Sequence, residues 1–166
     1  MKLSEHPLVR RYSGRCAVLD ANVLLLHMLC ALDFSLLSLF KRLEIFEEYD
    51  YLLLSELLKS FSGWCTTPHV LTEVSNLTNS LPGWRKSSWT EYFSEQIQLI
   101  PELFEDSAQI ASDASAIRFG LTDAALASLA NTHLVITVDW PLTGFLESRG
   151  LAVLNLRHLK GIEFTL

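Results

Sequence analysis

Short apolar runs alternate with longer amphipathic segments along most of the chain. The run Cys16–Leu19 predicts a strand, and an almost wholly apolar helix follows it as far as Leu32, with Asn22 where the N-cap is expected. Further strands are predicted at Trp64–Thr66, Leu134–Val138 and Leu151–Leu156. Because helices separate each pair of strands, we expect a parallel sheet that is covered on both faces.

Helical spacing of apolar residues, with typical start and stop residues, predicts most of what lies between the strands. Thr67–Pro68 is a strong helix start, with Thr at the N-cap and Pro in the first turn. The predicted helices are 34–46, 49–61, 67–78, 88–99 (from a capping box at Ser88–Glu91 after a loop over 79–88), 101–119, one capped at Thr122, and 140–150.

The length of 166 residues suits one domain with a full core, spanning 1–166. Residues 1–14 have no clear periodicity and are interpreted as a lead-in, and 31–63 as a helical insert after the first strand and helix. No repeat or internal boundary interrupts the chain.

Apolar residues make up 49% of the chain and mean hydropathy is +0.26, which raises the question of a membrane span. The longest apolar run, around Val23–Leu32, contains His27 and is well short of the roughly 20 residues that a span needs. Glu5 and Pro7 stand where a signal peptide would need an apolar stretch. We therefore expect a soluble, cytoplasmic protein without a membrane partner, whose composition permits a homodimer, and whose three widely spaced cysteines are buried, reduced thiols.

Four acidic residues stand at positions where a parallel sheet gathers its ligands. Asp20 and Asp139 directly follow predicted strands, and Glu73 lies in the second turn of the helix after another, so these three should meet beyond the carboxyl edge of the sheet. Asp123 lies in the first turn of a helix that runs into a strand, so we expect this helix to be tipped back over that edge. Each acid taken alone also suits a helix cap or a solvated helix position.

Together, the four acids indicate a cation site, because no Lys or Arg lies within four positions of any of them. Two carboxylates about 6 Å apart repel by roughly 3 kcal/mol at an effective dielectric constant of 20. Carboxylate oxygens without a cysteine or a histidine pair suit Mg²⁺ or Mn²⁺ better than zinc. The net charge of −6 is unfavourable for binding nucleic acid, and a metal would offset it.

The residues around these acids carry a family resemblance. Leu19–Leu24 (LDANVL), Thr67–Val74 (TPHVLTEV), Gly120–Ala125 (GLTDAA) and Ile136–Asp139 (ITVD) resemble, in order, the four acidic motifs of the PIN-domain family, which includes the VapC-type toxin ribonucleases and is related to flap endonucleases. The resemblance covers about Cys16 to Leu156, although the insert is longer than in the compact toxins.

This resemblance implies a three-layer α/β/α sandwich around a mostly parallel sheet and metal-dependent hydrolysis of RNA phosphodiester bonds. It makes Asp20, Glu73, Asp123 and Asp139 the catalytic, metal-binding acids, with Asn22 and Thr137 as polar support, and it places the Asp123 helix over the site. Mg²⁺ or Mn²⁺ would be the cofactor, RNA the substrate, and an antitoxin protein the partner if the chain is a toxin. Asn22 is also expected to cap its helix and thereby orient Asp20.

Trp84, Arg85 and Lys86, with Trp89 close by, form a basic and aromatic cluster that suits stacking on bases and contact with phosphate. The alternative is a loop whose tryptophans pack on the core.

Three rival interpretations share parts of the pattern. A haloacid-dehalogenase-type phosphatase would need an acid in place of Asn22 and a lysine before a later acidic pair, and a receiver domain would need a paired acid and a late lysine. Neither lysine is present near Asp123 or Asp139. A non-catalytic PIN-like module that binds another protein is the remaining alternative, and it should not be stabilised by Mn²⁺.

Overall fold

Four short strands form a single parallel sheet in the order β2-β1-β3-β4 in the computed structural model, which describes residues 2–161 except the Ser115 side chain. Val18 lies opposite Cys65 on one side and Val135 on the other. The parallel α/β architecture predicted from the sequence is therefore confirmed. The strands are β1 (Cys16–Leu19), β2 (Gly63–Cys65), β3 (Leu134–Thr137) and β4 (Val153–Asn155).

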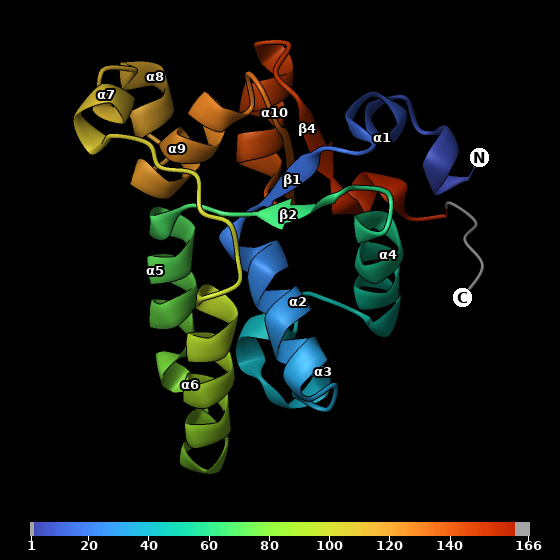
Figure 1. The fold of residues 1–166 in the computed structure, drawn as a ribbon, viewed down its shortest axis with the longest axis vertical. Helices are drawn as coiled ribbons and strands as arrows, with labels where there is room; N and C mark the ends of the chain where they lie inside the picture. Colours follow the sequence, from blue (N-terminus) through green and yellow to red (C-terminus); the bar gives the residue numbers. More distant parts are fainter. Residues whose placement is uncertain (1, 162–166) are drawn as a thin grey trace.

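Both faces of the central strands are covered. Ala17, Val18 and Leu19 are fully buried in succession, although neighbouring residues of a strand point to opposite faces. In Figure 1, α2 and α4 extend below the sheet while α9 and α10 lie above it, on the other side. This covering explains why the strands are apolar throughout rather than alternating.

Helices supply most of the remaining structure. They are α1 (Pro7–Tyr12), α2 (Ala21–Leu32), α3 (Leu36–Leu39), α4 (Glu48–Leu58), α5 (Pro68–Leu77), α6 (Gly83–Ile97), α7 (Ser107–Ala111), α8 (Ala114–Ile117), α9 (Leu121–Leu129) and α10 (Trp140–Ser148), with 3-10 helices η1 (Leu3–Glu5), η2 (Lys41–Leu43), η3 (Thr78–Ser80) and η4 (Leu156–Leu159). The lead-in thus includes a short helix, and α1 buries Val9 and Tyr12 in the core. Within the described residues, no helix has the length and apolarity needed to cross a membrane.

Two predicted helix starts were wrong in detail. Asp20, not Asn22, is the N-cap of α2, because its carboxylate accepts the Val23 N–H at 2.7 Å. The N-cap of α9 is Gly120, whose φ of +103° suits a residue without a Cβ, and Thr122 is already inside the helix.

Three predicted segments also differ from the structure. Residues 34–46 form only α3 and η2, because the chain is extended at Phe40 between them. Part of the predicted loop over 79–88 is helical: α6 starts at Gly83, after Pro82, so the Ser88 capping box is not used. Burial of Trp89 against the core secures this longer helix.

The predicted helix over 101–119 is replaced by an extended stretch and two short helices. Glu102 bridges to Thr66 beside β2, and the Leu103 N–H donates to the Thr66 carbonyl oxygen at 2.8 Å. Asp106 then begins α7 by accepting two backbone N–H groups. Backbone pairing with the sheet edge and this new N-cap outweigh the helical spacing.

All three cysteines are free thiols, with Cys30 and Cys65 buried and Cys16 half-buried. The expectation of reduced cysteines therefore holds, although Cys16 is less enclosed than predicted.

Candidate functional site

The direction of the chain reverses between β1 and β3, where ligands bind in open parallel sheets. From β1 the chain passes to β2 on one side, and from β3 it passes to β4 on the other. The crevice beyond the carboxyl ends of β1 and β3 is therefore the topological switch point of the sheet. Asp20 follows β1 and Asp139 follows β3 by two residues, so both acids stand at this crevice.

Asp20 is held by three hydrogen bonds in a buried position, with 4% of its surface exposed. One carboxylate oxygen accepts the Val23 N–H, and the other accepts the Thr137 hydroxyl and, at 3.4 Å, the Val138 N–H. Hydrogen bonds to α2 and to the end of β3 therefore fix the carboxylate in a single orientation.

Asp139 is tied to the same Thr137 side chain. Its backbone N–H donates to the Thr137 hydroxyl oxygen at 3.0 Å, and its Oδ1 accepts the Leu142 N–H at 2.6 Å as the N-cap of α10. Thr137, expected from the resemblance as polar support, thus connects the two acids. Both acids also serve as helix caps, which was the structural alternative for each.

A row of buried polar groups continues from Asp139 to β4. The Thr143 hydroxyl donates to the Asp139 carbonyl oxygen at 2.5 Å, the Asn155 amide donates to the Thr143 hydroxyl at 2.8 Å, and Asn155 Oδ1 accepts the Arg157 N–H at 3.0 Å. Thr143 and Asn155 were missed from the sequence. The pattern that could have identified them is a polar residue within the apolar strand 151–156 and a threonine four positions after Asp139.

Glu73 and Asp123 approach from the other side of the crevice. Glu73 lies in α5, which packs against α9, and Asp123 lies in the first turn of α9. Both side chains are half-buried, and neither forms a hydrogen bond or ion pair with the described residues. The structure thus leaves these two carboxylates without a polar protein partner in the described chain.

No tipping of α9 is needed to bring Asp123 here, so that expectation was wrong. Helix α9 ends at Leu129, shortly before β3 begins at Leu134, so its C-terminal end lies near the start of the strand. Its first turn therefore lies at the opposite edge, with the carboxyl ends of the strands. A crossover helix that runs back along a parallel sheet always begins at this edge.

The charges of the other three acids act on Asp123. Burial, followed by the charges of Asp139, Asp20 and Glu73, raises the pKa of Asp123 to about 7. Burial also raises the pKa of Asp20 to about 6, with a further contribution from Asp139, against the lowering effect of its three hydrogen bonds. Near neutral pH these two carboxyl groups are therefore partly protonated when no cation is present.

Within residues 2–161, no Lys or Arg forms an ion pair with any of the four acids. The ion pairs of the described residues involve other acids: Glu56, Asp33, Asp113, Glu47 and Asp50. Two carboxyl groups with raised pKa values, Asp20 and Asp123, that have no Lys or Arg partner in the described chain are unusual in a structural role, since buried charges are normally paired.

The oxygen donors suit a hard divalent cation, although the side-chain positions do not yet form a closed ligand set. No three His, Cys, Asp or Glu side chains in residues 2–161 come together in an arrangement that would hold a metal ion. Asp123 and Glu73 are half-buried and form no hydrogen bond or ion pair with the described residues, so no polar contact there fixes their side-chain torsions. An oxygen-only set of this kind fits Mg²⁺ or Mn²⁺.

A cleft of about 410 Å³ opens beside Glu73. Glu73 lines it from α5 and Leu121 from the start of α9. The other lining residues are Pro68, His69, Thr72, Asn76 and Thr122. Of the four acids, Glu73 is the one that lines this cleft, between α5 and the start of α9.

The remaining predicted site residues lie in different places. Asn22 is half-buried in the first turn of α2, beside Asp20, and forms no hydrogen bond with the described residues. Trp84, Arg85 and Lys86 begin α6, where Arg85 forms an ion pair with Asp33. Asp33 ends α2, whose 12 residues span about 18 Å from the Asp20 end. The structure does not bring this cluster to the acids, and a substrate would have to extend along α2 to reach it.

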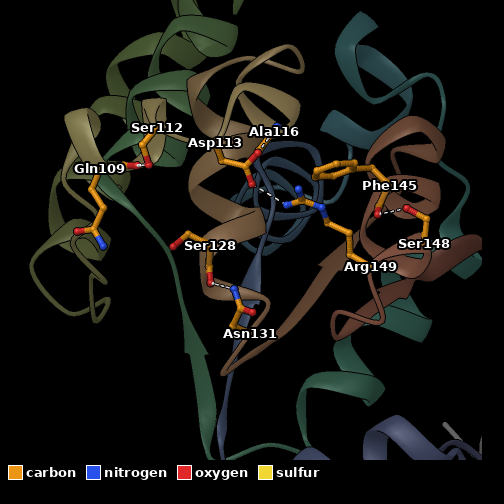
Figure 2. Close-up of polar contacts among 9 residues, drawn as sticks. All are labelled: Gln109, Ser112, Asp113, Ala116, Ser128, Asn131, Phe145, Ser148 and Arg149. Atoms are coloured by element: carbon orange, nitrogen blue, oxygen red, sulfur yellow. Dashed lines mark hydrogen bonds and ion pairs between the residues drawn. The ribbon is translucent and has the colours of Figure 1, made fainter.

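A second hollow, of about 500 Å³, lies away from the crevice, among α7, α8, α9 and the end of α10. Figure 2 shows Arg149 between the Phe145 ring and the Asp113 carboxylate, to which it donates at 2.6 Å. Asp113 is the one acid among the described lining residues, and its charge is neutralised. The size of this hollow therefore does not make it the better candidate for chemistry.

Comparison with known proteins adds no assignment: the chain matches no family model, and no curated protein shows significant sequence similarity to it.

Proposed function

We propose that the protein is a divalent-metal-dependent ribonuclease that hydrolyses RNA phosphodiester bonds, with a PIN-like three-layer arrangement. The observation that supports this proposal is the placement of Asp20 and Asp139 at the switch point of a parallel sheet, where Thr137 connects them and neither forms an ion pair with a Lys or Arg in residues 2–161. Asp123, whose pKa is raised in part by the charges of Asp139, Asp20 and Glu73, adds to it. The order and local sequence of the four acids resemble the PIN-domain motifs. We propose RNA as the substrate from this resemblance.

Asp20, Asp123 and Asp139 would hold one or two Mg²⁺ or Mn²⁺ ions, with Glu73 as a direct or water-mediated ligand. When bound, a divalent ion stabilises negative charge on the phosphodiester and makes water a better nucleophile at neutral pH. The chain contributes the placement of the carboxylates. Thr137 holds the Asp20 carboxylate and the Asp139 backbone in a fixed relation, so less reorganisation is needed on binding.

The raised pKa values have a direct consequence for metal binding. Near neutral pH Asp123 and Asp20 retain protons that a cation must displace. Metal affinity should therefore increase with pH through about pH 6–7, and binding should release protons.

Cleavage of single-stranded RNA by purified protein with Mn²⁺ or Mg²⁺ tests the proposal. We expect Asp20→Asn to lower the rate by more than about 100-fold, because a ligand is lost while the N-cap is retained. The matched control is Glu95→Gln, which changes an exposed acid on α6 that has no polar partner in the described part of the chain, and this variant should cleave like the unmodified protein. Cleavage that survives EDTA, or that Asp20→Asn leaves undiminished, would contradict the proposal.

A role as the toxin of a toxin–antitoxin pair is a narrower form of the same proposal. It requires that expression of the protein arrests growth of a bacterial host, that Asp20→Asn relieves the arrest, and that a partner protein restores growth. The non-catalytic interaction module makes the opposite prediction for metal, because it gains no thermal stability from Mn²⁺.

A further inference from the structure

Trp140 is a large aromatic residue that remains at the surface immediately beside the acids. It is the first residue of α10 and follows Asp139, so their Cα atoms are about 3.8 Å apart. Its side chain is 55% exposed, while the same helix buries Leu142 and Leu146. Helix packing therefore does not account for the position of the indole.

The aromatic ring that contacts the Trp140 indole comes from the segment after β4. His158, in η4 after β4, lies against Trp140 with ring centroids 4.7 Å apart and planes tilted by 55°. Since His158 is itself exposed, this contact covers little of the indole, and much of the ring system stays accessible.

The other tryptophans are covered or lie against a paired group. Trp89 is buried, and half-buried Trp64 packs edge-on against His27 at 5.3 Å. Exposed Trp84 has the Arg85 guanidinium 4.2 Å from its ring centroid, and that guanidinium is itself paired with Asp33. Of these four residues, Trp140 combines exposure with a position next to the carboxylates.

A cation stands at the same end of the sheet. Half-buried Arg157 donates one N–H to the Ile45 carbonyl oxygen at 3.3 Å, and it forms no ion pair with a carboxylate in the described chain. A guanidinium has five N–H donors, so most remain for an anionic ligand. On a chain with net charge −6, this positive group directly precedes His158, the residue that contacts Trp140.

Hydrogen bonds connect the backbone of Arg157 to that of Asp139, the residue before Trp140. Thr143 links the Asp139 carbonyl group to Asn155, and Asn155 in turn accepts the backbone N–H of Arg157. The segments that carry Trp140 and Arg157 are therefore joined through this network, and the Trp140–His158 ring contact joins them a second time.

We propose that Trp140, Arg157 and His158 form a nucleotide-binding platform on the β4 side of the crevice, where a base of single-stranded RNA stacks on the Trp140 indole and a neighbouring phosphate contacts Arg157. Bases must be unstacked to lie on an indole, so single strands are favoured over duplexes, with little sequence preference. The RNA then crosses the carboxyl edge of the sheet, from the platform past the acids to the cleft beside Glu73. The platform rests on the proposed ribonuclease function for its substrate.

Binding of a labelled oligouridylate, measured by fluorescence anisotropy in EDTA at low ionic strength, tests the platform without cleavage. We expect Trp140→Ala to weaken binding about tenfold and Trp140→Phe to retain most of the affinity. Arg157→Gln should reduce the slope of log affinity against log salt concentration by about one. Trp84→Ala is the matched control, and it should bind like the unmodified protein.

Two further measurements distinguish the nucleotide-binding platform from the nuclease activity. With Mn²⁺, Trp140→Ala should raise KM for RNA while kcat changes little, because stacking contributes to binding rather than to the reacting bond. Loss of binding in Trp140→Ala in a protein that shows no cleavage supports the platform alone. Unchanged affinity and KM in a folded Trp140→Ala, equal weakening by Trp84→Ala, or tighter binding of a duplex than of the single strand would overturn the platform even if RNA is cleaved.

Discussion

Helix α9 contributes to two regions in which carboxylates have opposite surroundings, unpaired in one and paired with an arginine in the other. In its first turn, Asp123 has no basic partner among the described residues, and burial together with the charges of Asp139, Asp20 and Glu73 raises its pKa to about 7. Beside the hollow that α9 helps to line, Asp113 is paired with Arg149 over the Phe145 ring. A paired carboxylate already has its favourable interaction, whereas the unpaired group in the crevice gains one only when a cation arrives. The unpaired charges, rather than the volume of the hollow, therefore indicate where function lies.

The largest effect on stability is expected from Thr137→Val, which removes the hydroxyl between Asp20 and Asp139. Asp20 loses a hydrogen bond to its charged form and the partly buried Asp139 N–H loses its acceptor, so the free energy of unfolding should fall by about 2–3 kcal/mol. Chemical denaturation at about pH 8 and pH 5 measures this, with a smaller loss at the lower pH because Asp20 is then mostly protonated. The exposed Thr90→Val serves as the control. If Thr137→Val loses no more free energy of unfolding than Thr90→Val, Thr137 does not stabilise the protein by connecting Asp20 and Asp139.

The next-largest effect concerns the crevice, where removing a charge should change the free energy of unfolding in the opposite direction from removing the charge of Asp113. The folded-state pKa values of Asp20 and Asp123, about 6 and 7, exceed the ordinary value of 3.8. In the pH range between the ordinary and the raised pKa values, the folded protein therefore binds more protons than the unfolded chain. The free energy of unfolding of the metal-free protein should therefore fall as pH rises from about 4 to 7, and level off above that range. Asp123→Asn should stabilise the metal-free protein by about 1–2 kcal/mol at pH 8, since one repelling charge is removed from a partly exposed site.

The smallest effect belongs to the paired acid. Asp113→Asn breaks an ion pair whose two side chains are 39% and 41% exposed, so we expect a loss of at most about 1 kcal/mol in the free energy of unfolding. Denaturation of both variants in one buffer gives the comparison directly. Stabilisation by Asp113→Asn together with destabilisation by Asp123→Asn would reverse the contrast between the two regions.

Local sequence patterns predicted the strands and the candidate acids, because each depends on short-range features. Cys16–Leu19 and Leu134–Val138 are apolar on both faces, as covered parallel strands must be, and Asp20 and Asp139 follow them directly. The position of Asp123 could also have been predicted, since a helix between parallel strands begins at their carboxyl edge whether it is followed or preceded by a strand.

Features that depend on contacts between distant segments were not predictable in the same way. The stretch after Pro101 has helical spacing, yet it is extended beside β2. Backbone hydrogen bonds to Thr66, 35 or more positions earlier in the chain, hold it in that conformation. Arg85 suited phosphate in the sequence, but the fold places it beside Asp33. Trp140 became a candidate for nucleotide binding only through its exposure and its contact with His158 from the far side of β4.

Calorimetric titration of the metal-free protein with Mn²⁺ at about pH 8 tests most directly whether these acids share a cation. We predict saturable binding that releases protons in the neutral range, weakens at about pH 5.5, and falls more than about tenfold in Asp123→Asn but not in Asp113→Asn. Absence of saturable binding, or equal affinity in Asp123→Asn and the unmodified protein, would contradict the account.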